Sequence, residues 1–161
     1  GNNAGRTTQG ANAVSIGRIA GQTTQGTGSI AIGASAGTTS QSSNAVAVGF
    51  GAGTTSQGAS AVAVGINAGS ATQGANSVAV GANAGQTSLG ASSICIGPNT
   101  AANTFTNSIV IGNGAAANAS NQLALGSAAN PLTTTLTAGV VNRYISVLIN
   151  GVAYKIALLN P

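Results

Sequence analysis

The sequence predicts an all-β chain, a parallel β-solenoid of about eight coils that ends in a β-hairpin. Three observations predict it. A glycine recurs every 16 residues from Gly1 to Gly97, a short alternating run of small and β-branched residues precedes each such glycine from Gly17 onward, and the 161 residues include no Asp, Glu or His. A 16-residue period is too short for a helix pair or a propeller blade, but it suffices for one solenoid coil.

The alternating runs are the strand expected in each coil. They read AVSIG at 13–17, SIAIG at 29–33, AVAVG at 45–49 and 61–65, SVAVG at 77–81 and SICIG at 93–97. Alternation over about five residues, punctuated by glycine, is typical of a β-strand. The spacing then shortens to 15 residues at SIVIG (108–112) and to 14 at QLALG (122–126). We therefore assign residues 1–126 to the solenoid.

Each run has two faces, because side chains alternate along a strand. The larger residues share one face and should stack into an apolar ladder: Val14/Ile16, Ile30/Ile32, Val46/Val48, Val62/Val64, Val78/Val80 and Ile94/Ile96. The Ala or Ser between them faces the other way, where its small size would let another surface approach. About two large apolar side chains per coil make a thin core. We therefore expect an obligate oligomer that associates through the Ala/Ser face.

Two polar columns recur with the same period and are candidate surface ladders for a partner. They are Thr7, Thr23, Thr39, Thr55 and Thr87, and Gln9, Gln25, Gln41, Gln57 and Gln73. Stacked identical amides or hydroxyls stiffen β structures through side-chain hydrogen bonds. A Thr ladder on a flat face could also order water, as in ice-binding solenoids. However, Thr followed by Gln-Gly is more typical of a turn.

The repeat ends after Gly126. Residues 127–142, with Asn130-Pro131 and a Thr-rich run, are expected to be a linker, and residues 143–161 a β-hairpin closed by a type I′ turn at Asn150-Gly151. The candidate assembly residues of the hairpin are Tyr144, Ile145, Val147, Ile149, Val152, Tyr154 and Ile156. An isolated hairpin is marginally stable. It would either cap the last coil or act as a trimerisation element where three hairpins meet.

The composition argues against an enzyme. General acid–base catalysis uses carboxylates or imidazoles, and metal centres use these groups or thiolate clusters. The chain offers one Cys, one Lys and two Tyr instead. Cys95 occupies the small-residue column and is expected to be a buried substitute for Ala. We therefore expect no catalytic residues, no metal and no other cofactor.

Two further motifs are explained by the repeat or by composition. The G-x-G-x-x-A string from Gly112 to Ala117 resembles a dinucleotide-binding turn, but no acidic residue follows to hold a ribose. The four cations, which give a net charge of +4, do not cluster, so nucleic acid is not an expected partner. No apolar run is long enough to span a membrane.

The strings NSVAVG (76–81), GSIAIG (28–33) and SNAVAVG (43–49) resemble head repeats of YadA-type trimeric autotransporter adhesins. Similar repeats occur in surface fibre proteins of large DNA viruses. The resemblance covers roughly residues 1–126, although the bacterial family usually has a 14-residue period, found here only at 112–126. It implies a left-handed parallel β-roll, three chains side by side and a role in surface attachment.

These observations together predict a non-enzymatic, adhesive head of a homotrimeric surface fibre. Its partners would be two further copies of itself and a host-surface receptor or matrix. Its location would be extracellular, or on a virion or cell surface. The alternatives are a self-assembling extracellular filament subunit and, third, an ice-binding solenoid.

Overall fold

The computed structural model describes residues 1–131, 144–149 and 152–157, and these residues form strands and turns without a helix. Six two-residue strands form one parallel sheet, here called the Gln sheet: β1 (Thr8–Gln9), β3 (Thr24–Gln25), β5 (Ser40–Gln41), β7 (Ser56–Gln57), β9 (Thr72–Gln73) and β11 (Ser88–Leu89). Eight three-residue strands form a second, the Val/Ile sheet: β2 (Val14–Ile16), β4 (Ile30–Ile32), β6 (Val46–Val48), β8 (Val62–Val64), β10 (Val78–Val80), β12 (Ile94–Ile96), β13 (Ile109–Ile111) and β14 (Leu123–Leu125).

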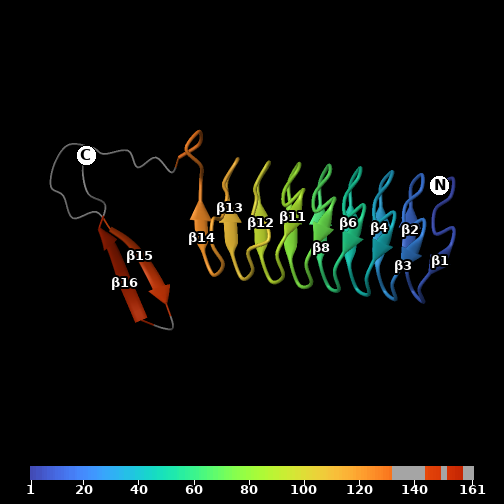
Figure 1. The fold of residues 1–161 in the computed structure, drawn as a ribbon, viewed down its shortest axis with the longest axis horizontal. Coiled ribbons are helices and arrows are strands. Elements are labelled where there is room, and N and C mark those ends of the chain that lie inside the picture. Colours follow the sequence, from blue (N-terminus) through green and yellow to red (C-terminus); the bar gives the residue numbers. More distant parts are fainter. Residues whose placement is uncertain (132–143, 150–151, 158–161) are drawn as a thin grey trace.

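The strand register confirms the solenoid. Val62 lies beside Val78, which follows it by one repeat, and Val78 lies beside Ile94. The shorter coils keep the same alignment, since Ile94 pairs with Ile109 and Ile109 with Leu123. Successive coils therefore stack like on like into a rod of about seven turns, with the N-terminus in the first coil (Figure 1).

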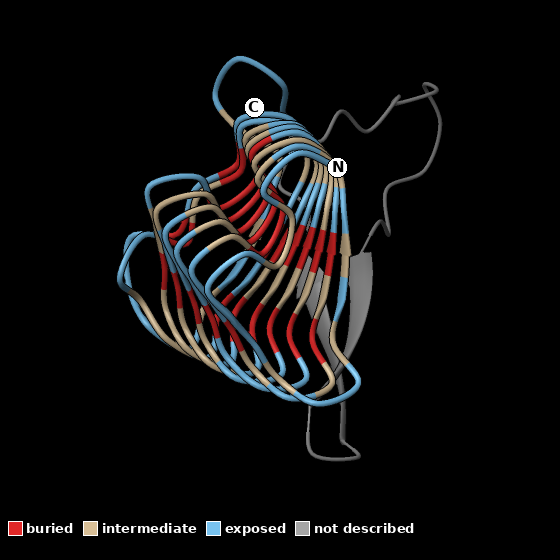
Figure 2. Ribbon diagram, turned by 90° about the vertical axis from the view of Figure 1, so that its right-hand side faces the viewer, coloured by how far each residue is buried: buried red, intermediate tan, exposed pale blue. Residues whose placement is uncertain are grey.

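Small residues fill the interior of the coils. The central residue of each Val/Ile strand points inward, and Ala31, Ala47, Ala63 and Ala79 are fully buried. A second buried row comes from the turns between the sheets and comprises Ala20, Ala36, Ala52, Ala68 and Ala84. Figure 2 shows these buried positions as continuous rows along the rod. The expectation that the Ala/Ser face mediates association is therefore wrong. The coil leaves room for only a small side chain opposite the strand centre, where a Cβ at Gly53 would lie 3.2 Å from the Ala47 Cβ.

The glutamine column is also inside. Gln25, Gln41, Gln57 and Gln73 are only 1–2% exposed, so the predicted surface ladder is wrong at these four positions, while Gln9 in the first coil is exposed. In β3, β5, β7 and β9 the Thr or Ser points outward and the Gln inward. Burial is possible because the amide finds partners among the described residues, where no buried side-chain nitrogen or oxygen lacks a hydrogen bond.

Tight turns close each coil. Gly65 has a φ of +129°, and a Cβ at this position would lie 2.6 Å from the carbonyl oxygen of Gly81 in the next coil. Other corners carry Asn or Ser in the left-handed region, such as Asn76 with a φ of 58°. Asn tolerates this conformation better than most residues do, because its side chain can bond locally. The recurring Gly and Asn therefore mark the corners of the coil.

The predicted hairpin strands are β15 (Tyr144–Ile149) and β16 (Val152–Ala157), which pair in antiparallel fashion. Ile149 lies opposite Val152, and Val147 lies opposite Tyr154. Residues 150–151 lie outside the described part of the chain, as do residues 132–143, so the predicted turn type and most of the predicted linker do too.

Candidate interaction surfaces

The outer face of the Val/Ile sheet is an apolar stripe. Each of its eight strands directs its first and third residues outward: Val14, Ile16, Ile30, Ile32, Val46, Val48, Val62, Val64, Val78, Val80, Ile94, Ile96, Ile109, Ile111, Leu123 and Leu125. Val64 is 36% exposed, and Leu123 near the C-terminal end of the rod is 55% exposed. The predicted apolar ladder therefore exists, but it faces outward.

The stripe is large for a free surface. Eight strands at about 4.8 Å spacing make it roughly 35 Å long and two side chains wide. Contiguous exposed apolar patches of this kind mark interaction sites. Covering the exposed part of each side chain contributes on the order of 1 kcal/mol. Phe50 and Ile66, each 56% exposed, lie at the turns that follow β6 and β8.

The predicted threonine column lies on the outside of the solenoid. Thr7, Thr23, Thr39, Thr55 and Thr87 are all exposed, each directly before a strand of the Gln sheet. The next residue in each coil is the outward Thr or Ser of that strand, as at Thr8 and Ser56. The hydroxyls therefore form two adjacent columns, one within the strands of a parallel sheet and one at the N-terminal ends of those strands. They do not lie on an isolated turn.

Few groups in the described residues could perform chemistry. Cys95 is fully buried, and burial raises the pKa of its thiol, which disfavours the nucleophilic thiolate. The described residues contain no cluster of three or more His, Cys, Asp or Glu side chains that could hold a metal. The glycines of the G-x-G-x-x-A string, Gly112 and Gly114, lie in a solenoid turn that no helix follows. Nothing in the described part of the chain is a helix that could cross a membrane.

Sequence reasoning found the two faces of the Val/Ile strands but assigned them the wrong way round. A usable clue was present in the sequence. The residue at the inward position of the strand is small in most coils, and a second row of Ala recurs in the turns with the same period.

Comparison with protein-family models gives no match for this chain, and comparison with curated proteins gives none either.

Proposed function

We propose that this chain is the adhesive head of a homotrimeric surface fibre, in which three left-handed β-rolls pack together through the Val/Ile sheet. The observation that carries the proposal is the uninterrupted apolar stripe on the outside of that sheet. The interior of the solenoid holds mainly Ala, Ser and Gln, so most of the Val and Ile side chains lie outside it. Covering the stripe with two further copies buries these side chains.

The number three rests on the resemblance to YadA-type head repeats. A flat stripe on each protomer fits a closed arrangement around one axis, in which every copy buries the same face. The hairpin of β15 and β16 would then join its counterparts and hold the three chains in register. Its apolar candidate residues are those of the sequence prediction, from Tyr144 to Ile156.

Packing through the Val/Ile sheet leaves the Gln sheet facing outward. Its surface carries the exposed Thr and Ser columns. A partner would meet a regular array of neutral hydroxyls there, on an assembly with about 3 × 4 = 12 positive charges. This surface is where we place the contact with a host receptor or matrix.

Sedimentation velocity and chemical cross-linking of the full chain test the assembly. A single species of about three times 15.0 kDa at all concentrations supports the head. Polymers that lengthen with concentration would support the filament alternative instead. One observation favours discrete particles. At the C-terminal end of the rod the Gln sheet stops at β11 while the Val/Ile sheet continues to β14, so β1 of a following copy would have no adjacent Gln-sheet strand to pair with.

Attachment needs its own test. Fluorescent beads coated with the full chain should adhere to at least one surface in a panel of intact cells and immobilised matrix proteins, and beads coated with serum albumin should not. Replacing Thr39 and Thr55 by Lys should reduce adhesion while the sedimentation profile stays unchanged. Equal adhesion of both bead types on every surface would contradict the adhesive role.

Ice binding remains a second candidate because of one observation. The exposed Thr residues border a six-stranded parallel sheet, whose regular spacing an isolated turn would lack. Thermal hysteresis measured in nanolitre droplets decides this alternative: a hysteresis gap would support it, and freezing behaviour equal to that of serum albumin would remove it.

A further inference from the structure

The buried polar side chains of the described residues are all amides or hydroxyls. They are Gln25, Ser29, Gln41, Gln57, Gln73, Ser77, Ser93, Thr100 and Ser108. Amides and hydroxyls stay neutral on acidification, whereas a carboxylate takes up a proton at about pH 4. Acid therefore changes the charge of none of these buried side chains.

The hydrogen bonds inside the coil also lack an acid-sensitive acceptor. The Gln41 Nε2 donates to the Ile30 carbonyl at 2.7 Å and to the Gln57 Oε1 at 3.1 Å. The Ser77 Oγ donates to the Gly74 carbonyl at 2.6 Å. Acid denaturation usually begins where native carboxylates that accept hydrogen bonds become protonated. The acceptors named here are backbone carbonyls and an amide oxygen, which keep their bonds in acid.

The groups of the described residues that can carry a charge are few. Arg6, Arg18 and the amino-terminal Gly1 are exposed, and they are positively charged throughout the acid range. Cys95 is buried, and burial raises the pKa of its thiol from the ordinary 9.0. A raised thiol pKa weakens the fold only where the unfolded chain would release the proton, which is in alkaline solution. None of these groups makes the fold less stable in acid.

The net charge also changes little on acidification. A protein of this length and ordinary composition loses about 20 carboxylate charges in acid, and the positive self-repulsion that results destabilises its compact state. This chain has a net charge of +4 and no Asp or Glu, so only its terminal carboxylate takes up a proton and the charge rises to +5. Self-repulsion therefore stays small.

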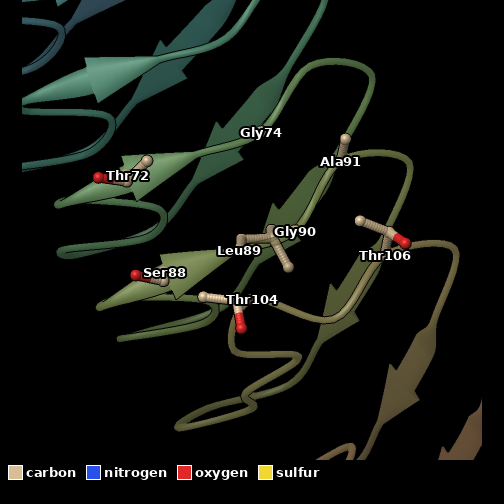
Figure 3. Close-up of a pocket in the computed structure, with 8 residues that line it drawn as sticks. All are labelled: Thr72, Gly74, Ser88, Leu89, Gly90, Ala91, Thr104 and Thr106. Atoms are coloured by element: carbon tan, nitrogen blue, oxygen red, sulfur yellow. The ribbon is translucent and has the colours of Figure 1, made fainter. Parts of the chain in front are cut away.

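The two exposed faces are as insensitive as the interior. Figure 3 shows a hollow of about 270 Å³ to which β9 and β11 contribute. Thr72, Ser88, Thr104 and Thr106 line it with hydroxyls, and its other lining residues are Gly, Ala and Leu. The outward side chains of the Val/Ile sheet are Val, Ile and Leu. Both faces therefore present the same groups in acid as at neutral pH.

We propose that the solenoid is an acid-resistant attachment body, in which the fold, the association state and the hydroxyl face of the Gln sheet are the same at pH 2.5 as at pH 6. A contact made through these faces is then not released by protonation of this chain. The acid resistance of the fold does not depend on the proposed function, whereas that of the association rests on it.

Urea unfolding of the full chain at pH 2.5, 4 and 6, followed by circular dichroism, tests the fold. We expect urea midpoints that agree within about 0.3 M, because no buried group gains or loses a proton in this range. A midpoint that falls by more than this at pH 2.5 would overturn the proposal.

Gln41→Glu is the matched control, because it adds one carboxyl group to the buried column. Burial favours the neutral form and raises the pKa of this carboxyl, so the variant is most stable below the ordinary pKa of a glutamate and loses stability as the pH rises. Its midpoint should be lower at pH 6 than at pH 2.5 by at least about 0.5 M. The parent chain decides the proposal, and the control shows that the measurement detects a single titrating group.

Sedimentation velocity and backbone amide NMR at pH 2.5 and 6 test the association state and the hydroxyl face. We expect one sedimentation profile and superimposable amide signals for Thr39 and Thr55. An association state that changes between the two pH values, or a shift of these amides, would overturn the proposal. A single chain at both pH values with a constant urea midpoint would contradict the trimer and leave the acid resistance of the fold in place.

Discussion

At the scale of single residues, the molecule depends on neutral side chains that can be stacked. The Gln57 Nε2 donates to the Val46 carbonyl at 2.7 Å, to the Ala61 carbonyl at 3.2 Å and to the Gln73 Oε1 at 3.2 Å. An amide donates and accepts at once, so it can repeat in every coil. A carboxylate in such a column would place like charges about 4.8 Å apart and would have no hydrogen to donate. The absence of Asp and Glu follows from this architecture.

Gln57→Glu tests this reason with almost no change of shape. At pH 7 the buried carboxylate faces two carbonyl oxygens that it cannot donate to, and we expect a loss of several kcal/mol in the free energy of unfolding. Lowering the pH towards about 4 should recover part of the loss, because protonation restores a donor. Urea unfolding at both pH values measures it. The exposed Thr55→Val should change stability by less than about 0.5 kcal/mol at either pH.

Cys95 gives a second prediction. Burial raises the pKa of its thiol, so the thiol stays protonated and shielded in the folded chain. We expect reaction with a disulfide reagent at pH 8 to be at least about a hundredfold slower in the folded chain than in urea. Rapid reaction of the folded chain would show that the coil around Cys95 opens readily.

At the scale of the coil, the period and the strand positions could be predicted from the sequence, but the inside and outside could not. Alternation defines two faces without saying which one is buried. The usual rule that large apolar residues lie inside fails for the Val/Ile strands of the 16-residue coils, because the opposite wall leaves room for only a small side chain such as Ala47 at the strand centre. The inward Gln column was missed for the same reason, since a polar residue beside Thr suggests an exposed turn. The Thr column, by contrast, is exposed as predicted.

The end of the Gln sheet at β11, while the Val/Ile sheet continues to β14, could not be predicted either. The sequence shows that the period shortens to 15 residues after Gly97, but it does not show which side of the coil loses residues. That depends on where Thr100 and Asn103 accept their hydrogen bonds.

Gly65→Ala tests the corner of the coil. The methyl group would meet the Gly81 carbonyl at 2.6 Å, and the φ of +129° is one that Ala rarely adopts. We expect a loss of at least about 2 kcal/mol in the free energy of unfolding. Ala59→Ser, at an exposed corner, is the matched control and should stay within about 0.5 kcal/mol of the parent. A Gly65→Ala chain as stable as this control would show that successive coils are spaced more widely than described.

At the scale of the whole molecule, the apolar stripe of the Val/Ile sheet is the exposed surface with the features of an interaction site. It runs along all eight strands, from β2 to β14. The Gln sheet, with its exposed Thr and Ser hydroxyls, lies on another face of the coil. The molecule thus has one face suited to assembly and another suited to recognition.

Sedimentation equilibrium with circular dichroism on two adjacent variants tests the central claim most directly, because Val64 points out of the coil and Ala63 points in. We predict that the parent chain sediments at about three times 15.0 kDa. Val64→Asp should lose the trimer but keep the β-sheet spectrum, since the charge sits on the association face. Ala63→Asp should lose both. Trimers that persist in Val64→Asp, or a Val64→Asp chain that unfolds as Ala63→Asp does, would contradict the account.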